Sequence, residues 1–107
     1  MRFLPAAAAA LALALISGLA GAQAYPARSV RIVVGFAPGG ATDVTARIVA
    51  QKLTEMWGQT VIVDNRPGAS DIIGAEAVVK AAPDGYTLLV SPQTSTSVAA
   101  TLYPKLP

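Results

Sequence analysis

The sequence contains neither cysteine nor histidine. Without cysteine, no disulfide stabilises the fold and no lipid can be attached to a cysteine at a cleavage site. Without histidine, the usual Ser-His and Cys-His catalytic pairs, histidine general bases and common zinc sites are all excluded. We therefore expect no metal centre, and we expect a binding protein and not an enzyme.

Charged residues are also scarce. The chain has 8 Lys and Arg against 6 Asp and Glu, which gives a formal net charge of +2. This balance provides no strongly basic surface for nucleic acid or for an anionic membrane. We expect neither as a partner.

A long apolar run occurs only at the N-terminus. Arg2 gives a short positive segment, residues 6–19 are rich in Ala and Leu, and Ala22-Gln23-Ala24 is a small-x-small cleavage site. The apolar run is shorter than the about 20 residues that span a bilayer. We expect residues 1–24 to be a cleaved signal peptide. Residues 25–107 are then expected to act outside the cytoplasm, without insertion in a membrane.

Short β-branched runs alternate with helical patterns in the rest of the chain. The expected order is β-α-β-α-β, with strands near residues 30–36, 61–63 and 86–90 and helices from residues 42 and 71. A further helix is expected over residues 98–103. This alternation predicts an α/β fold with a parallel sheet and right-handed crossovers. Two helices over three strands leave apolar surface and both sheet edges bare, so the lobe is expected to be incomplete.

The first expected helix has a clear apolar pattern. Its large apolar residues fall on one stripe and predict the buried face, namely Val44, Ile48, Val49, Leu53 and Met56. Thr42 is expected to cap the helix, and Gly58 is expected to end it. Trp57 is expected to pack at the helix end.

The loop before this helix is the main candidate ligand site. Ligands of open α/β sheets bind beyond the carboxyl ends of strands, where this loop lies. Its glycines allow close approach, and the N–H groups of the first helical turn favour an anion such as a carboxylate. The candidate residues are Phe36, Pro38, Gly39, Gly40, Thr42 and Asp43. A tight turn without a ligand is the alternative interpretation.

A nucleotide cofactor is not expected at this loop. Residues 35–42 resemble the phosphate-binding pattern G-x-x-x-x-G-K-[ST], but Ala41 occupies the lysine position and Pro38 lacks an N–H group. We expect no cofactor.

A second glycine-containing loop precedes the second expected helix and is expected at the same sheet edge. Its candidate contacts are Arg66, Gly68 and Ser70. Arg66 can pair with a ligand carboxylate or with Asp64, and Ser70 can contact a ligand or cap the helix.

These motifs together resemble the Bug family, the periplasmic solute-binding proteins of tripartite tricarboxylate transporters. The resemblance rests on Phe36-Ala37-Pro38-Gly39-Gly40 with Thr42-Asp43, on residues 65–69, on residues 73–76 and on residues 81–88. It implies a type II periplasmic-binding-protein fold, a small carboxylate ligand and a membrane permease as partner. It also implies that the loop over residues 36–43 lines the cleft.

Two departures from the family pattern stand out. Ser70-Asp71 replaces a glycine-rich sequence, and a carboxylate there disfavours a nearby anion. Family members are also much longer, so residues 25–107 are expected to be the N-terminal part of the first lobe, with the second lobe absent. A truncated gene product without ligand binding is the alternative to a functional fragment.

Overall fold

The computed structural model describes residues 24–102. The signal peptide expected over residues 1–24 therefore lies almost wholly outside the described residues. Among residues 24–102, no helix is both long and apolar enough to cross a membrane.

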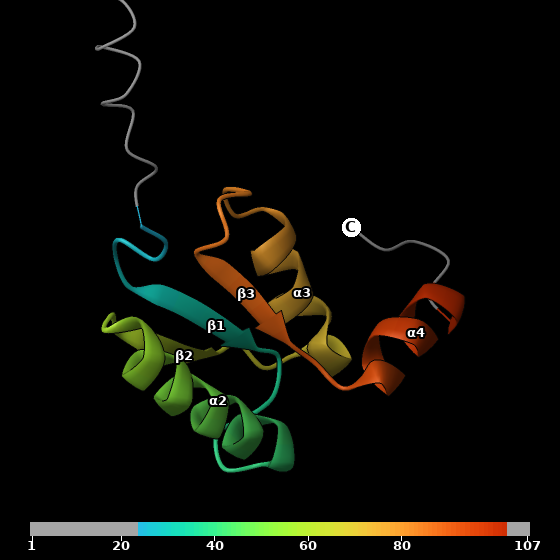
Figure 1. The fold of residues 1–107 in the computed structure, drawn as a ribbon. Helices are drawn as coiled ribbons and strands as arrows, with labels where there is room; N and C mark the ends of the chain where they lie inside the picture. The colour runs from blue at the N-terminus through green and yellow to red at the C-terminus, as the bar shows by residue number, and fades with distance from the viewer. Residues whose placement is uncertain (1–23, 103–107) are drawn as a thin grey trace, which may run out of the picture.

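A three-stranded parallel sheet forms the centre of the fold (Figure 1). Its strands are β1 (Val30–Val34), β2 (Val61–Asn65) and β3 (Thr87–Val90), arranged in the order β2-β1-β3. Val30 pairs with Val61 on one side of β1, and Arg31 pairs with Thr87 on the other. The predicted α/β class and parallel sheet are confirmed.

Helices connect the strands and cover the sheet. They are α2 (Ala41–Trp57), α3 (Ile72–Val79), preceded by the short 3₁₀ turn η1 (Ala69–Asp71), and α4 (Gln93–Leu102). α2 packs on β1 and β2, and α3 packs on β1 and β3. The crossover from β1 to β2 and the crossover from β2 past β1 to β3 run in opposite directions along the sheet. Because crossovers of this kind are right-handed, α2 and α3 lie on opposite faces of the sheet (Figure 1).

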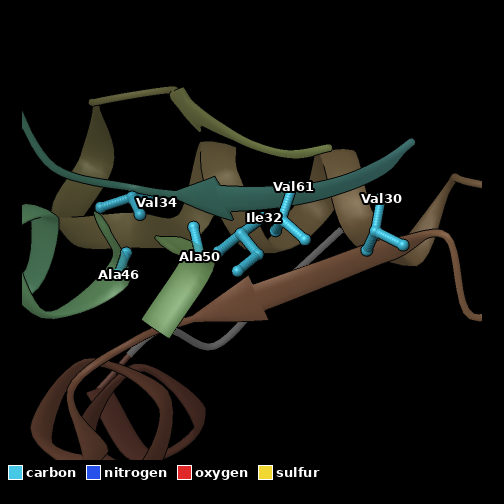
Figure 2. Packing of buried hydrophobic residues seen from close by; sticks show 6 residues of the cluster. All are labelled: Val30, Ile32, Val34, Ala46, Ala50 and Val61. Atoms are coloured by element: carbon cyan, nitrogen blue, oxygen red, sulfur yellow. The ribbon is translucent and has the colours of Figure 1, made fainter. Parts of the chain in front are cut away.

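The buried core lies between β1 and α2. Figure 2 shows its six members, Val30, Ile32, Val34, Ala46, Ala50 and Val61. The alternating residues of β1 point to this face, while Val33 is buried on the opposite one. Burial on both faces explains why the sequence of β1 is a continuous β-branched run.

The predicted buried face of α2 was wrong except at Leu53, which packs against the core. Ala46 and Ala50 are buried, with Leu53 and Trp57 packed beside them, whereas Met56 is 76% exposed. Val44, Ile48 and Val49 are exposed as well. The small alanine side chains let the helix backbone approach the sheet closely, and this outweighs the larger apolar residues on the next stripe.

Two helix starts also differ from the predictions. The residue that caps α2 is Gly40 and not Thr42, and it makes no side-chain capping bond. α4 starts at Gln93, five residues before the predicted position, because its small polar residues are helical too. Gly58 ends α2 in the left-handed conformation, as predicted, and its N–H donates to the carbonyl of Thr54.

An aromatic cluster closes the amino edge of the sheet. The ring of Tyr25 meets those of Trp57 and Tyr86 edge-on, with centroids 5.7 and 5.2 Å away. The guanidinium of Arg28 lies 4.0 Å from the centroid of the Tyr86 ring and pairs with Asp84. Trp57 therefore packs at the helix end, as predicted.

Candidate functional site

The carboxyl edge of the sheet collects the starts of three helices. α2 follows β1, η1 and α3 follow β2, and α4 follows β3, each after a short loop. Helix N-termini carry partial positive charge and free N–H groups. In the strand order β2-β1-β3, β2 and β3 lie on opposite sides of β1, so the order reverses next to β1. Open α/β sheets bind ligands beyond the carboxyl ends of the strands at such a switch point. The geometry therefore favours an anion site at this edge.

The loop over residues 36–43 reaches this edge from β1. Pro38, Gly39 and Gly40 are exposed, and Phe36 is half-buried against the core. Gly39 has a φ of 92°, a conformation that side-chain-bearing residues rarely adopt. Thr42 lies in the first turn of α2, partly exposed and outside the capping position. The predicted loop residues thus surround the start of one helix.

Asp43 is buried and has three hydrogen-bond donors. Its Oδ2 accepts from the Gly39 N–H at 2.9 Å and from Arg47 Nε at 2.9 Å, and its Oδ1 accepts from Asn65 Nδ2 at 2.9 Å. The bond from Arg47, with those from Gly39 and Asn65, lowers the pKa of the Asp43 carboxyl to about 2, against the opposing effect of its burial. The ionised carboxylate fixes the loop conformation, and its lone pairs face the protein.

Arg47 and Asn65 were missed by the sequence analysis as site residues. Asn65, at the end of β2, donates from Nδ2 to the Phe36 carbonyl as well as to Asp43. Arg47 donates to Asn65 Oδ1 at 3.1 Å. The three polar side chains thus connect the first loop to the start of the second. The spacing of Asp43 and Arg47, four residues apart on a helix, was a readable signal of an ion pair.

The second loop has a different character. Arg66 pairs with Asp64, at 3.0 Å, which is the alternative that the sequence left open. Gly68 has a φ of 141°. A Cβ atom added at this position would clash with Cδ1 of Ile73, so a larger residue does not fit there. Ser70 is exposed with a φ of 53°, and the residue that caps α3 is Asp71. Ser70 therefore does not cap the helix.

Asp71 occupies the switch point between β1 and β3. It is only 2% exposed and has a φ of 78°. Its carboxylate packs between Gly35, just after β1, and Gly74 in α3, and the Ser91 hydroxyl donates to its Oδ2. Oδ1 has no hydrogen-bond partner. Ser91 directly follows β3, and the polar residues after that strand were the signal that could have identified it.

The chemistry available at this edge is ligand binding. Backbone N–H groups at the helix starts can hold a carboxylate, since such groups are the usual protein partners of small anions. Within residues 24–102, no group of three His, Cys, Asp or Glu side chains could hold a metal ion.

The fold is a parallel α/β sheet covered by helices, and solved structures of periplasmic binding proteins are similar to it. The periplasmic binding protein BugD superposes with a TM-score of 0.58 at 48% identity, over 61% of this chain and 22% of BugD. MatC from Rhodopseudomonas palustris, solved with bound malate, gives a TM-score of 0.72 at 40% identity, over 77% of this chain and 28% of MatC.

The sequence model of the tripartite tricarboxylate transporter family receptor matches residues 45–107, and the chain belongs to this family. BugT of Bordetella pertussis is 45% identical to it over 98 residues, which are 91% of this chain and 30% of BugT. The resemblance to the Bug family is thus confirmed. The chain spans about 30% of the length of this relative.

Proposed function

We propose that residues 25–107 are the N-terminal part of the first lobe of a periplasmic receptor, following a signal peptide at residues 1–24. The receptor captures a small carboxylate and delivers it to the membrane permease of a tripartite tricarboxylate transporter. It acts by binding and performs no catalysis. Family membership supports this proposal, since the family consists of transporter receptors.

The observation that carries the proposal is the meeting of three helix starts at the switch point of the sheet. Pro38, Gly39, Gly40 and Thr42 form the most accessible of these starts, and we assign the ligand carboxylate to them. Phe36 and Asp43 support the loop from below. We assign Gly68 and Ser70 to the far wall of the site. We assign no direct ligand contact to Arg66, because its guanidinium is paired with Asp64.

Gly40 allows a direct test. Its φ of −78° suits any residue, and the nearest atom to an added Cβ is 3.8 Å away, so a side chain fits. Asn and Asp are equally good helix caps of nearly equal size and differ in charge. The protein expressed from its complete reading frame is titrated calorimetrically with mono-, di- and tricarboxylates, with neutral sugars as control ligands.

We expect saturable binding of at least one carboxylate. Gly40→Asp is expected to weaken that binding at least tenfold, because its charge repels the anion, while Gly40→Asn retains most of it. Binding that is equal in the two variants would place the ligand elsewhere. Absence of binding across all carboxylates would contradict the proposed function.

A second candidate, a chain without ligand binding of its own, is favoured by one observation. Large apolar side chains are exposed on the described residues, with Val79 80% and Met56 76% exposed, and both β2 and β3 are edge strands. Such surface disfavours a stable isolated lobe. A cooperative thermal transition of the 107-residue chain after signal removal, shifted upward by a carboxylate, would reject this candidate.

A further inference from the structure

The charge at the switch point is unbalanced. Arg47 pairs with Asp43, and Arg66 pairs with Asp64. In the part of the chain that the structure describes, Asp71 takes part in no ion pair, and its only donor is the hydroxyl of Ser91. One of the two buried carboxylates at this edge is therefore neutralised by a cation, and the other is not.

The position of Asp71 relates this charge to the ligand. Its carboxylate lies between Gly35, which leads into the first loop, and Ser91, which leads into α4. These two segments continue from the carboxyl ends of the paired strands β1 and β3, where open α/β sheets bind ligands. A ligand that places one carboxylate at the start of α2 and extends over these strand ends brings its far end toward Asp71.

A buried charge acts on such a ligand without touching it. Water screens a group that is 2% exposed only weakly, so its field persists over several ångströms. The field opposes a second ligand carboxylate and favours a neutral or cationic far end. The first ligand carboxylate is held by the backbone N–H groups of the first loop.

On the basis of the proposed function, we infer that Asp71 is a specificity-determining residue that makes the site select carboxylates with an uncharged or cationic far end over dicarboxylates. The ligand class is thus a monocarboxylate or a zwitterion such as an amino acid. MatC, whose structure holds malate, shows that a relative binds a dicarboxylate. This chain is expected to differ from it.

Three four-carbon ligands that differ only at one end provide the test. Butanoate, 4-aminobutanoate and succinate have a neutral, a cationic and an anionic far end. Their dissociation constants are measured by calorimetry on the protein from its complete reading frame, and the same series is used at another chain length if only longer or shorter carboxylates bind. We expect succinate to bind at least tenfold more weakly than the other two.

Asp71→Asn removes the charge and keeps the shape of the side chain. It is expected to reduce the ratio of the succinate dissociation constant to that of butanoate at least tenfold. Asp71→Gly serves as the second variant, since glycine accepts the positive φ. Glu76→Gln removes a carboxylate that pairs with Lys80 on the exposed side of α3, and it is the matched control. Circular dichroism establishes that each variant is folded.

The outcomes separate the two proposals. Tight succinate binding by the natural protein, or discrimination unchanged in Asp71→Asn, overturns the inference about Asp71 while the proposed function stands. Absence of binding for every carboxylate overturns both. If neither variant folds, the order of the three affinities in the natural protein decides.

Discussion

At the scale of single residues, two buried aspartates at one sheet edge differ in their surroundings. Asp43 receives three hydrogen bonds, one of them from the guanidinium of Arg47 with which it forms an ion pair. Its charge is therefore stabilised and holds the first loop to β2. Asp71 receives one hydrogen bond and adopts a left-handed conformation. The first aspartate is a structural group of the loop, and the second leaves a charge at the site.

Asp43 predicts a pH dependence of stability. Its pKa is lowered to about 2 in the folded chain from its ordinary value of 3.8, so the folded state binds its proton less readily than the unfolded state. The stabilisation is therefore complete above about pH 4 and is lost as the pH falls through 4 toward 2. We expect Asp43→Asn to lower the free energy of unfolding at pH 7 and to bring it closer to the natural protein at pH 2.

Urea denaturation at several pH values measures this difference. Glu55→Gln, which removes an exposed carboxylate paired with Lys52 on the same helix, is the control and should leave the free energy of unfolding nearly unchanged. A loss of stability in Asp43→Asn that is the same at pH 2 as at pH 7 would contradict the assignment.

At the scale of elements, α2 is positioned by its smallest side chains. Ala46 and Ala50 contact the sheet, and Asp43 lies on the same side of the helix, nearer the carboxyl edge of the sheet. The helix start that forms the candidate site is therefore held in place by a close helix–sheet contact. This contact leaves little space for a larger residue.

Enlarging a residue on this side of the helix is expected to be costly. Ala46→Leu adds volume at a position that is fully buried, and overpacking of this kind costs about 1–3 kcal/mol. Val49→Leu, on the exposed stripe, is expected to change stability by less than about 0.5 kcal/mol. Thermal or chemical denaturation measures the stability of the two variants. Equal losses of stability would contradict this assignment and would support the buried face that the sequence predicted.

The sequence predicted most elements but not how they pack. The β-branched run of β1, the glycines after β1 and Gly58 were local signals, and the strands, the first loop and the end of α2 were predicted from them. The buried face of α2 was not predictable in the same way. Its alanines are buried because the helix packs closely on the sheet, and the hydrophobic pattern of the helix alone favoured the larger side chains. Asn65 and Ser91 were missed as site residues for a related reason, since their partners are far away in the chain.

At the scale of the whole molecule, the described residues form a sheet with both edges open. Several large apolar side chains lie on its outer surfaces, including Leu102, which is 68% exposed. The relative BugT is more than three times as long as the matched region. Contiguous exposed apolar surface is unusual in a monomeric protein and promotes binding of apolar dyes and self-association.

This surface gives a prediction for the 107-residue chain after signal removal. We expect it to enhance the fluorescence of the dye ANS more strongly, per mole, than full-length BugT does under the same conditions. Circular dichroism is recorded in parallel to show that the chain retains its helices and strands. Dye fluorescence as low as that of BugT, from a folded chain, would contradict the prediction.

The aromatic cluster at the amino edge has a practical consequence for protein engineering. Tyr25 donates a hydrogen bond to the Gly85 carbonyl and packs on two other rings, so the first residue after the expected cleavage site is part of the folded lobe. An affinity tag joined before Tyr25 leaves these contacts intact, whereas a fusion that deletes Tyr25 removes them. The tag also lies at the edge opposite the candidate site, which suits the protein to oriented attachment on a sensor surface.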